Sequence, residues 1–233
     1  MIDTVFFDLY HTLIHYEPPR EQVLAGTLSK QGIAADEQAL KKGIIAGDEY
    51  FYRENARKSL SRRTDSETKD MWLAYGKIVL EKAGIKPQRE LVASLLHDME
   101  ATRFERVLFH DVLPALGSLA SAGLTLGLIS NIDKDIKPLL DDLGLAPFLK
   151  VVLTSKEAGA TKPEPLIFLE AVKRSGTKAG RVLFVGDQYD IDVIGARSAG
   201  LNALLLDRDN YYTDIPREDK ISSLEEIIGR INS

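Results

Sequence analysis

The sequence predicts an α/β fold: a three-layer, Rossmann-like core with a mostly parallel sheet, joined by a helical domain. Short apolar runs rich in β-branched or aromatic residues alternate with helix-like segments, which is typical of right-handed crossovers between parallel strands. The runs are almost continuously apolar, as strands buried on both faces are. One long stretch, residues 16–106, breaks this alternation and has helical periodicity instead.

The core elements follow one another in a regular order. Strands are expected at Thr4–Phe7, Leu124–Ile129, Lys150–Leu153, Val182–Val185 and Ala203–Leu206. Helices are expected at Val112–Ala122, Lys134–Leu143, Pro165–Ser175 and Asp190–Ala199, with a last surface helix at Ile221–Ile231. The α/β core domain is therefore predicted to comprise residues 1–15 and 107–233.

Residues 16–106 are predicted to form a helical cap domain inserted after the first strand. Apolar residues recur there every three or four positions in three separate segments, and no convincing strand is visible from Glu17 to Arg106. Helix ends are also marked. The candidate N-caps are Asp36 and either Asp65 or Ser66, and the candidate C-cap glycines are Gly32 and Gly84.

Composition narrows the class of protein. The chain has 233 residues, of which 44% are hydrophobic, so it can bury a sizeable core. Its formal net charge of −5 argues against non-specific nucleic-acid binding, and the absence of cysteine excludes disulfides, zinc–thiolate sites and cysteine nucleophiles. No membrane-length apolar run and no leader-like segment is visible. We expect a cytoplasmic protein, monomeric or homodimeric, that does not bind membranes.

Chemistry-bearing residues follow several of the predicted strands. Asp8 comes directly after the first strand, Ser130 and Asn131 after the second, Lys162 in the loop after the third, and Asp187 after the fourth. Each alone has an ordinary explanation as a turn residue, a helix cap or a solvated loop lysine. Together they favour a ligand site, because ligands bind beyond the carboxyl ends of the strands in open α/β sheets.

These residue types suit phosphoryl transfer. Aspartate is a competent nucleophile for forming an acyl-phosphate. The carboxylates of Asp8 and Asp187 would repel each other without a cation, and a hard divalent ion such as Mg²⁺ is satisfied by oxygen ligands. Ser130 and Lys162 could hold the phosphate oxygens, and Lys162 would also offset charge in the transition state.

The sequence motifs around Asp8, Ser130, Lys162 and Asp187 resemble those of the haloacid dehalogenase (HAD) superfamily of hydrolases. The resemblance includes their order along the chain and the helical insertion after the first motif. Two strings are especially close to the family form: Lys162-Pro163-Glu164-Pro165-Leu166-Ile167-Phe168, and Val185-Gly186-Asp187 through Asp192, with Gly195-Ala196 and Ala199-Gly200. The resemblance implies that the nucleophile is Asp8 and that Mg²⁺ is bound by Asp8, Asp187 and the main-chain carbonyl of Tyr10.

The resemblance also implies roles for the remaining residues. Ser130 and Lys162 would bind phosphate or substrate, and Asn131 would shape its loop and contact the backbone. Thr12 would hold the turn after the first strand. Asp192 would support the site, for example by orienting Lys162, and Asp190 is the alternative for that role.

Tyr10 departs from the pattern of the family phosphatases, which usually carry a catalytic aspartate at this position. A tyrosine has an ordinary pKa of about 10 and cannot act as a base near neutrality without a large shift. Losing such a proton carrier typically lowers the rate by about 10²–10⁴-fold. His11 is a candidate replacement, because the ordinary pKa of histidine is about 6.5; its alternative role is that of a turn residue covering the strand end.

Tyrosine at this position is also the pattern of L-2-haloacid dehalogenases, whose halide leaving group needs no proton. Those enzymes are metal-free and carry a Ser-Ser-Asn-type string where this chain has Gly186-Asp187. Asp187 therefore favours a phosphatase that acts on a small phosphorylated metabolite through an aspartyl-phosphate, with its site in a cleft between core and cap. The alternatives are a 2-haloacid dehalogenase with an ester on Asp8, and a catalytically weak protein that binds a phosphorylated ligand or a partner.

Overall fold

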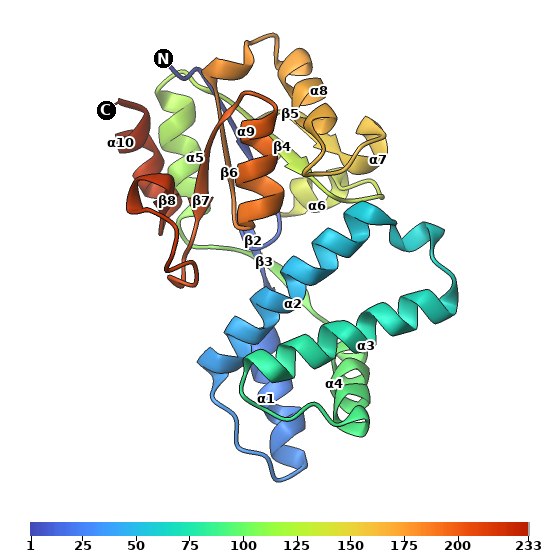
Figure 1. The fold of residues 1–233 in the computed structure, drawn as a ribbon. Coiled ribbons are helices and arrows are strands. Elements are labelled where there is room, and N and C mark those ends of the chain that lie inside the picture. Colours follow the sequence, from blue (N-terminus) through green and yellow to red (C-terminus); the bar gives the residue numbers. More distant parts are fainter. Residues whose placement is uncertain (233) are drawn as a thin grey trace. The chain divides into compact units, whose positions relative to one another are not determined.

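The computed structural model describes residues 1–232, and the chain forms two compact units (Figure 1). The first unit contains residues 1–15 and the chain from residue 107 onward, and the second contains residues 16–106. The first is an α/β core, and the second consists almost entirely of helices. Within residues 1–232, no helix combines the length and the apolarity needed to cross a lipid bilayer.

The core is built on a six-stranded sheet in the order β5-β4-β1-β6-β7-β8, and every pair of neighbours in it is parallel. The strands are β1 (Thr4–Phe7), β4 (Thr125–Ser130), β5 (Leu149–Thr154), β6 (Val182–Gly186), β7 (Asn202–Leu206) and β8 (Lys220–Ile221). The first five confirm the predicted strands to within one residue at each end. The α/β fold class is confirmed as well.

Helices cover both faces of this sheet (Figure 1). They are α5 (Val112–Ser121), α6 (Lys137–Asp142), α7 (Ser155–Ala158), α8 (Pro165–Ser175), α9 (Gly195–Ser198) and α10 (Ile227–Asn232). Successive residues of a strand point to opposite faces. Phe7 accordingly packs in a core that includes α5 and α6 residues, whereas Phe6 packs in a second core with α8 and α9 residues. Both phenylalanines are fully buried.

Three core helices differ from their predicted bounds. The helix expected at Lys134–Leu143 begins only at Lys137, whose backbone N–H is capped by the carboxylate of Asp135. The segment expected at Asp190–Ala199 is a π-helix over Tyr189–Ile194 followed by α9. The expected helix at Ile221–Ile231 begins as strand β8 and continues through a 3₁₀ turn, Leu224–Glu226, into α10.

Contacts with distant residues explain the last of these differences. The backbone N–H of Asp207 donates to the carbonyl of Ile221, which draws that residue into the sheet beside β7. The backbone N–H of Leu224 donates to the carboxylate of Asp111, far away in the sequence. Helical periodicity is a local signal and cannot register such partners.

The second unit contains α1 (Arg20–Lys30), α2 (Glu37–Arg57), α3 (Asp65–Lys82) and α4 (Arg89–Ala101). Asp36 caps α2, as predicted, by accepting a hydrogen bond from the N–H of Ala39. The N-cap of α3 is Thr64, not Asp65 or Ser66, because Thr64 and Glu67 form a capping box. Gly43 on α2 lies so close to the Val79 carbonyl of α3 that a Cβ there would overlap it.

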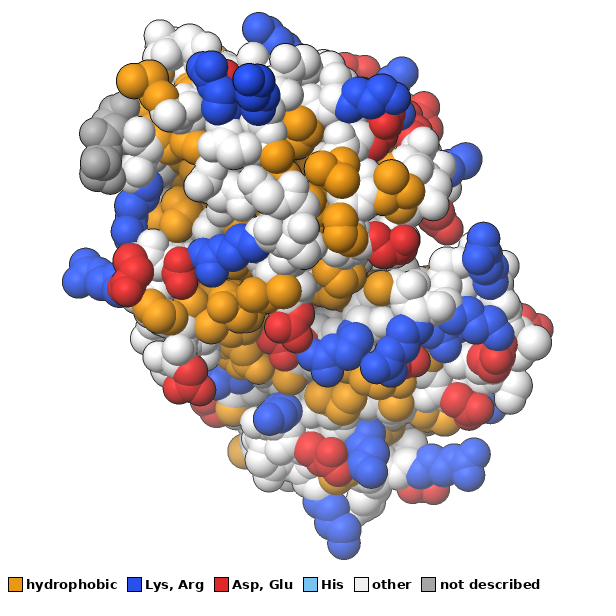
Figure 2. Space-filling view, turned by 45° about the horizontal axis from the view of Figure 1, so that its top comes forward, with side chains coloured by type: hydrophobic (Ala, Val, Ile, Leu, Met, Phe, Trp, Pro, Cys, Tyr) orange, Lys and Arg blue, Asp and Glu red, His pale blue; other side chains and the backbone are white. Residues whose placement is uncertain are grey.

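A two-stranded sheet, β2 (Ile14–Glu17) with β3 (Glu105–Leu108), was not predicted. Most of β3 is exposed, so its sequence lacks the apolar alternation that marks a half-buried strand. Short 3₁₀ turns complete the chain at Leu60–Arg62, Ala179–Arg181 and Arg217–Asp219. On the face shown in Figure 2, acidic and basic side chains are interspersed.

Candidate active site at the carboxyl edge of the sheet

The central strands bring the candidate residues to one edge of the sheet. Asp8 follows β1, Ser130 is the last residue of β4, and Asp187 follows β6. Because β1 pairs in parallel with both β4 and β6, their carboxyl ends lie side by side. The backbone N–H of Asp8 donates to the carbonyl of Val185 at 2.9 Å, which ties Asp8 to the end of β6. Ser130 is only 2% exposed.

Lys162 lies between two carboxylates. Its Nζ is 2.6 Å from Oδ1 of Asp8 and 2.6 Å from Oδ1 of Asp192. All three residues are buried, with exposed fractions of 2% for Lys162, 7% for Asp8 and 1% for Asp192. The same ammonium group lies 5.3 Å from the centre of the Phe184 ring. Lys162 therefore supplies positive charge directly at the candidate nucleophile.

Asn131 holds the loop that carries Lys162. Its side-chain amide donates to the Lys162 carbonyl at 2.9 Å and accepts from the Lys162 backbone N–H at 2.7 Å. Both ends of the Asn131 amide thus bind the backbone of Lys162, and this pair of hydrogen bonds anchors the loop after β4 to the loop before α8. The sequence placed both residues near the site without indicating this pairing.

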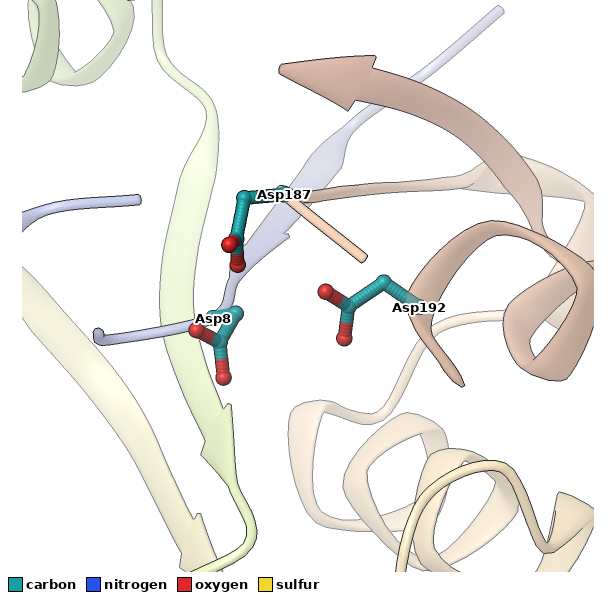
Figure 3. Close-up of side chains that lie close together, drawn as sticks. All are labelled: Asp8, Asp187 and Asp192. Atoms are coloured by element: carbon teal, nitrogen blue, oxygen red, sulfur yellow. The ribbon is translucent and has the colours of Figure 1, made fainter. Parts of the chain in front are cut away.

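Three carboxylates gather at this edge, those of Asp8, Asp187 and Asp192. One oxygen from each lies within 4.8 Å of the others. Figure 3 shows the three groups turned toward one another from the end of β1, the loop after β6 and the π-helical turn that follows. A Cβ at Gly186 would collide with the Asp192 carboxylate, so glycine is what lets this carboxylate approach. Asp190, by contrast, is exposed.

The carboxylates have unusual electrostatics. Burial raises the pKa of Asp8 to about 6; the Asp192 charge adds to this rise, and the ion pair with Lys162 opposes it. Burial also raises the pKa of Asp187 well above its ordinary value, and the charges of Asp8 and Asp192 act in the same direction. Burial acts to lower the pKa of Lys162, but the two carboxylates outweigh it and raise that pKa. Lys162 therefore stays charged and only partly relieves the carboxylate repulsion.

The residues after Asp8 form a tight turn. His11 has a φ of 61°, and its N–H donates to the carbonyl of Ile14 at 2.7 Å. Tyr10 is partly buried and packs against the core. The Thr12 hydroxyl is buried and makes no hydrogen bond to any residue that the structure describes; its carbonyl accepts one from Arg208 at 3.1 Å. The turn is thus held through the backbone of Thr12 and not through its side chain.

Two groups near the site were not singled out from the sequence. Gln188 follows Asp187 and donates to its Oδ2 at 3.1 Å. Arg208 pairs with both carboxylate oxygens of Asp111, at 2.9 and 3.0 Å, while it holds the Thr12 carbonyl. The position of Gln188 directly after Asp187 was an available signal. Asp111 and Arg208 lie far apart in the sequence, and no local pattern connects them.

The donor set fits a hard divalent cation. All the groups that meet at the cluster offer carboxylate oxygen, which is the ligand type that Mg²⁺ and Ca²⁺ take. One ammonium group cannot neutralise three carboxylates. Burial is the main cause of the raised pKa values of Asp8 and Asp187, and the charges of the neighbouring carboxylates add to that rise. A divalent cation would remove the excess of negative charge.

Comparison with known proteins gives the class. A family model described as haloacid dehalogenase-like hydrolase matches residues 2–200. The chain therefore belongs to the haloacid dehalogenase-like hydrolase family. The family expected from the sequence motifs is confirmed.

Two relatives are similar to this chain over part of their length, and one of them is named as a phosphatase. The chain is 36% identical over 126 residues to haloacid dehalogenase-like hydrolase domain-containing protein 3 of Danio rerio, covering 53% of this chain and 52% of that protein. It is 34% identical over 145 residues to the glyceraldehyde 3-phosphate phosphatase of Methanopyrus kandleri, covering 61% and 62%. The chain thus spans between half and two thirds of the length of these two relatives.

A solved structure extends the similarity over the whole fold. The 2-haloacid dehalogenase of Pseudomonas syringae pv. Tomato is 26% identical, with a TM-score of 0.57, and the match covers 100% of this chain and 99% of that one. A phosphatase and a dehalogenase are therefore both among the proteins that this chain is similar to.

Proposed function

We propose that this protein is a Mg²⁺-dependent phosphatase that hydrolyses a small phosphorylated metabolite through an aspartyl-phosphate on Asp8. The observation that carries the proposal is the position of Asp187, whose half-buried carboxylate faces the buried carboxylates of Asp8 and Asp192. A second carboxylate against the nucleophile is unfavourable unless a cation joins the site. It would serve no purpose in a metal-free dehalogenase.

The reaction divides into two steps in this proposal. An oxygen of Asp8 forms a bond to phosphorus while the bond from phosphorus to the ester oxygen breaks, and the departing oxygen takes up a proton. Water then attacks the phosphorus of the aspartyl-phosphate, loses a proton, and releases inorganic phosphate and the Asp8 carboxylate. Lys162 binds Oδ1 of Asp8, which leaves Oδ2 for the attack.

The other residues take supporting roles. Asp8, Asp187 and the main-chain carbonyl of Tyr10 would hold Mg²⁺, which when bound would shield the nucleophile from the anionic substrate. Ser130 would bind a phosphate oxygen. Asn131 shapes the loop, since both ends of its amide bind the Lys162 backbone. Asp192 orients Lys162 through the contact at 2.6 Å.

Substrate selection is assigned to the helical unit, residues 16–106, acting as a cap. The phosphatase named among the relatives supports a phosphorylated substrate. The second candidate function is 2-haloacid dehalogenation, which Tyr10 and the similarity to the Pseudomonas enzyme favour. In that reaction the same oxygen of Asp8 would displace halide from carbon and form an ester.

Turnover of p-nitrophenyl phosphate tests the proposal. An aryl phosphate has a leaving group that needs little protonation. The lack of a catalytic aspartate at position 10 should therefore lower its hydrolysis rate less than that of other phosphate esters. We expect turnover that requires Mg²⁺, stops with a chelator, and is lost in Asp8→Asn. The matched control is Asp142→Asn, the same chemical change at an exposed residue on α6, and it should keep wild-type turnover.

Two other results would replace the proposal. Metal-independent halide release from L-2-chloropropionate, also lost in Asp8→Asn, would establish the dehalogenase. A folded protein that turns over neither substrate but binds a phosphorylated ligand or a protein partner would establish the catalytically weak alternative.

A further inference from the structure

We propose that Gln188 is a positioning residue of the metal site: its amide nitrogen orients the Asp187 carboxylate, and its amide oxygen accepts a hydrogen bond from a water bound to the cation. This inference rests on the proposed function, because it requires a divalent cation at the acidic cluster. Gln188 is uncharged and contacts Asp187 and Asp192 of the acidic cluster through hydrogen bonds.

Gln188 connects two of the three carboxylates. Its side-chain Nε2 donates to Oδ2 of Asp187 at 3.1 Å, and its backbone N–H donates to Oδ2 of Asp192 at 3.0 Å. An ionised carboxylate only accepts hydrogen bonds, and the NH₂ end of the amide accordingly faces Asp187. Asp187 is thereby held in one orientation by its own neighbour in the chain.

The other end of the same amide has no partner. Oε1 of Gln188 is buried and accepts no hydrogen bond from any residue within the described part of the chain, and the whole residue is only 4% exposed. Leaving a buried acceptor unpaired is costly, and such groups in native proteins call for an explanation. Oε1 and Nε2 are bonded to the same carbon, so this oxygen belongs to the same amide group whose nitrogen contacts Asp187 at 3.1 Å.

Bound water is the donor that suits this oxygen. Within the described residues no side chain or backbone group donates to it. Mg²⁺ dehydrates reluctantly and keeps several of its waters when it binds to one or two carboxylates. Those waters are strong donors, and a neutral amide oxygen can accept from one without adding to the negative charge of the cluster.

Hydrogen-bond partners of metal ligands have measurable effects. Mutating them typically weakens metal binding by about 10–100-fold. The informative change is Gln188→Met, which keeps the length of the side chain but removes both the donor and the acceptor. The matched control is Gln38→Met, the same substitution at an exposed position of α2.

The test is Mg²⁺ binding by isothermal titration calorimetry without substrate, together with the Mg²⁺-induced shift in melting temperature. We expect Gln188→Met to fold with a wild-type circular dichroism spectrum and to bind Mg²⁺ about 10–100-fold more weakly than wild type. Its melting-temperature shift at a fixed Mg²⁺ concentration should be smaller. Gln38→Met should match wild type in both measurements.

Different failures have different meanings. Wild-type Mg²⁺ affinity in Gln188→Met would overturn the role of Gln188 while leaving the proposed function intact. A wild-type protein that binds no Mg²⁺, or that binds it unchanged after Asp187→Asn, would overturn both. A loss of thermal stability in Gln188→Met that is equal with and without Mg²⁺, at unchanged Mg²⁺ affinity, would make Gln188 a packing residue only.

Discussion

Replacing Lys162 with methionine is expected to destabilise the core unit strongly, and Mg²⁺ is expected to reverse much of the loss. Methionine fills nearly the same volume but removes the charge that separates Asp8 from Asp192. Lys162 forms ion pairs of 2.6 Å with both carboxylates, and its side chain is only 3% exposed. The substitution therefore leaves a buried group of carboxylates without a counter-charge.

The magnitude follows from the burial of these pairs. Removing one partner of a buried ion pair typically costs about 3–5 kcal/mol. For a protein of this size, that cost corresponds to a fall in melting temperature of about 6–20 °C. Lys173→Met on α8 is the matched control. Its side chain is 81% exposed and pairs with Glu170 at 3.6 Å, so we expect a change of less than about 1 kcal/mol.

The loss of stability in Lys162→Met should also depend on pH, and the protonation of Asp8 decides the direction of this dependence. The pKa of Asp8 is about 6 in the folded protein, above its ordinary value, and the charge of Lys162 acts to lower it. Without Lys162 that pKa rises further. An acid with a raised pKa in the folded state takes up a proton more readily than in the unfolded state, so folding is favoured as pH falls through that pKa and disfavoured as pH rises. The difference in melting temperature between wild type and Lys162→Met should therefore be larger at pH 8 than at pH 5.5.

Thermal unfolding followed by circular dichroism, with and without Mg²⁺ and at both pH values, measures these effects. The reasoning would be refuted if Lys162→Met melted within a degree or two of Lys173→Met under all conditions. It would also be refuted if the difference from wild type were the same at both pH values and in the presence of Mg²⁺, because the cause would then not be unneutralised carboxylate charge.

Two other substitutions probe separate features. Tyr10→Asp should restore a proton carrier and raise kcat for alkyl phosphates by about 10²–10⁴-fold, with a smaller gain for aryl phosphates; equal gains for both would contradict this account of Tyr10. Asp111→Asn should lower the free energy of unfolding in urea by about 3–5 kcal/mol, because fully buried Asp111 neutralises Arg208. Burial acts to raise the pKa of Asp111, but hydrogen bonds from Arg208 and the Leu224 backbone outweigh it and lower that pKa. Its stabilisation is therefore present above the ordinary aspartate pKa of about 4 and is lost as pH falls through the lower, folded-state value, so the gap between wild type and Asp111→Asn should narrow only below about pH 4.

Much of the fold could be predicted because its signals are local. Strands buried on both faces need continuous apolar runs, so Thr4–Phe7 and Val182–Val185 are visible in the sequence alone. Helices that bury one face need apolar residues every three or four positions, which reveals α2, α3 and α4. β3 was missed because an exposed strand needs neither pattern.

The candidate site was partly predictable for a related reason. Parallel strands end at the same edge of a sheet, so residues that follow different strands must come together there. Asp8, Ser130 and Asp187 could be assigned to one edge from the sequence for that reason alone. The motifs also indicated the family, which the match over residues 2–200 confirms.

Only the tertiary structure decided which side chains meet. It places Asp192, and not the exposed Asp190, against Lys162, and it pairs Asn131 with the Lys162 backbone. It also joins Asp111 to Arg208, and it leaves the amide oxygen of Gln188 buried without a partner among residues 1–232. The sequence by itself determined the elements and the edge where the site lies, because both depend on local periodicity and strand direction. The contacts within the site depend on how distant segments pack, and no local pattern encodes that packing.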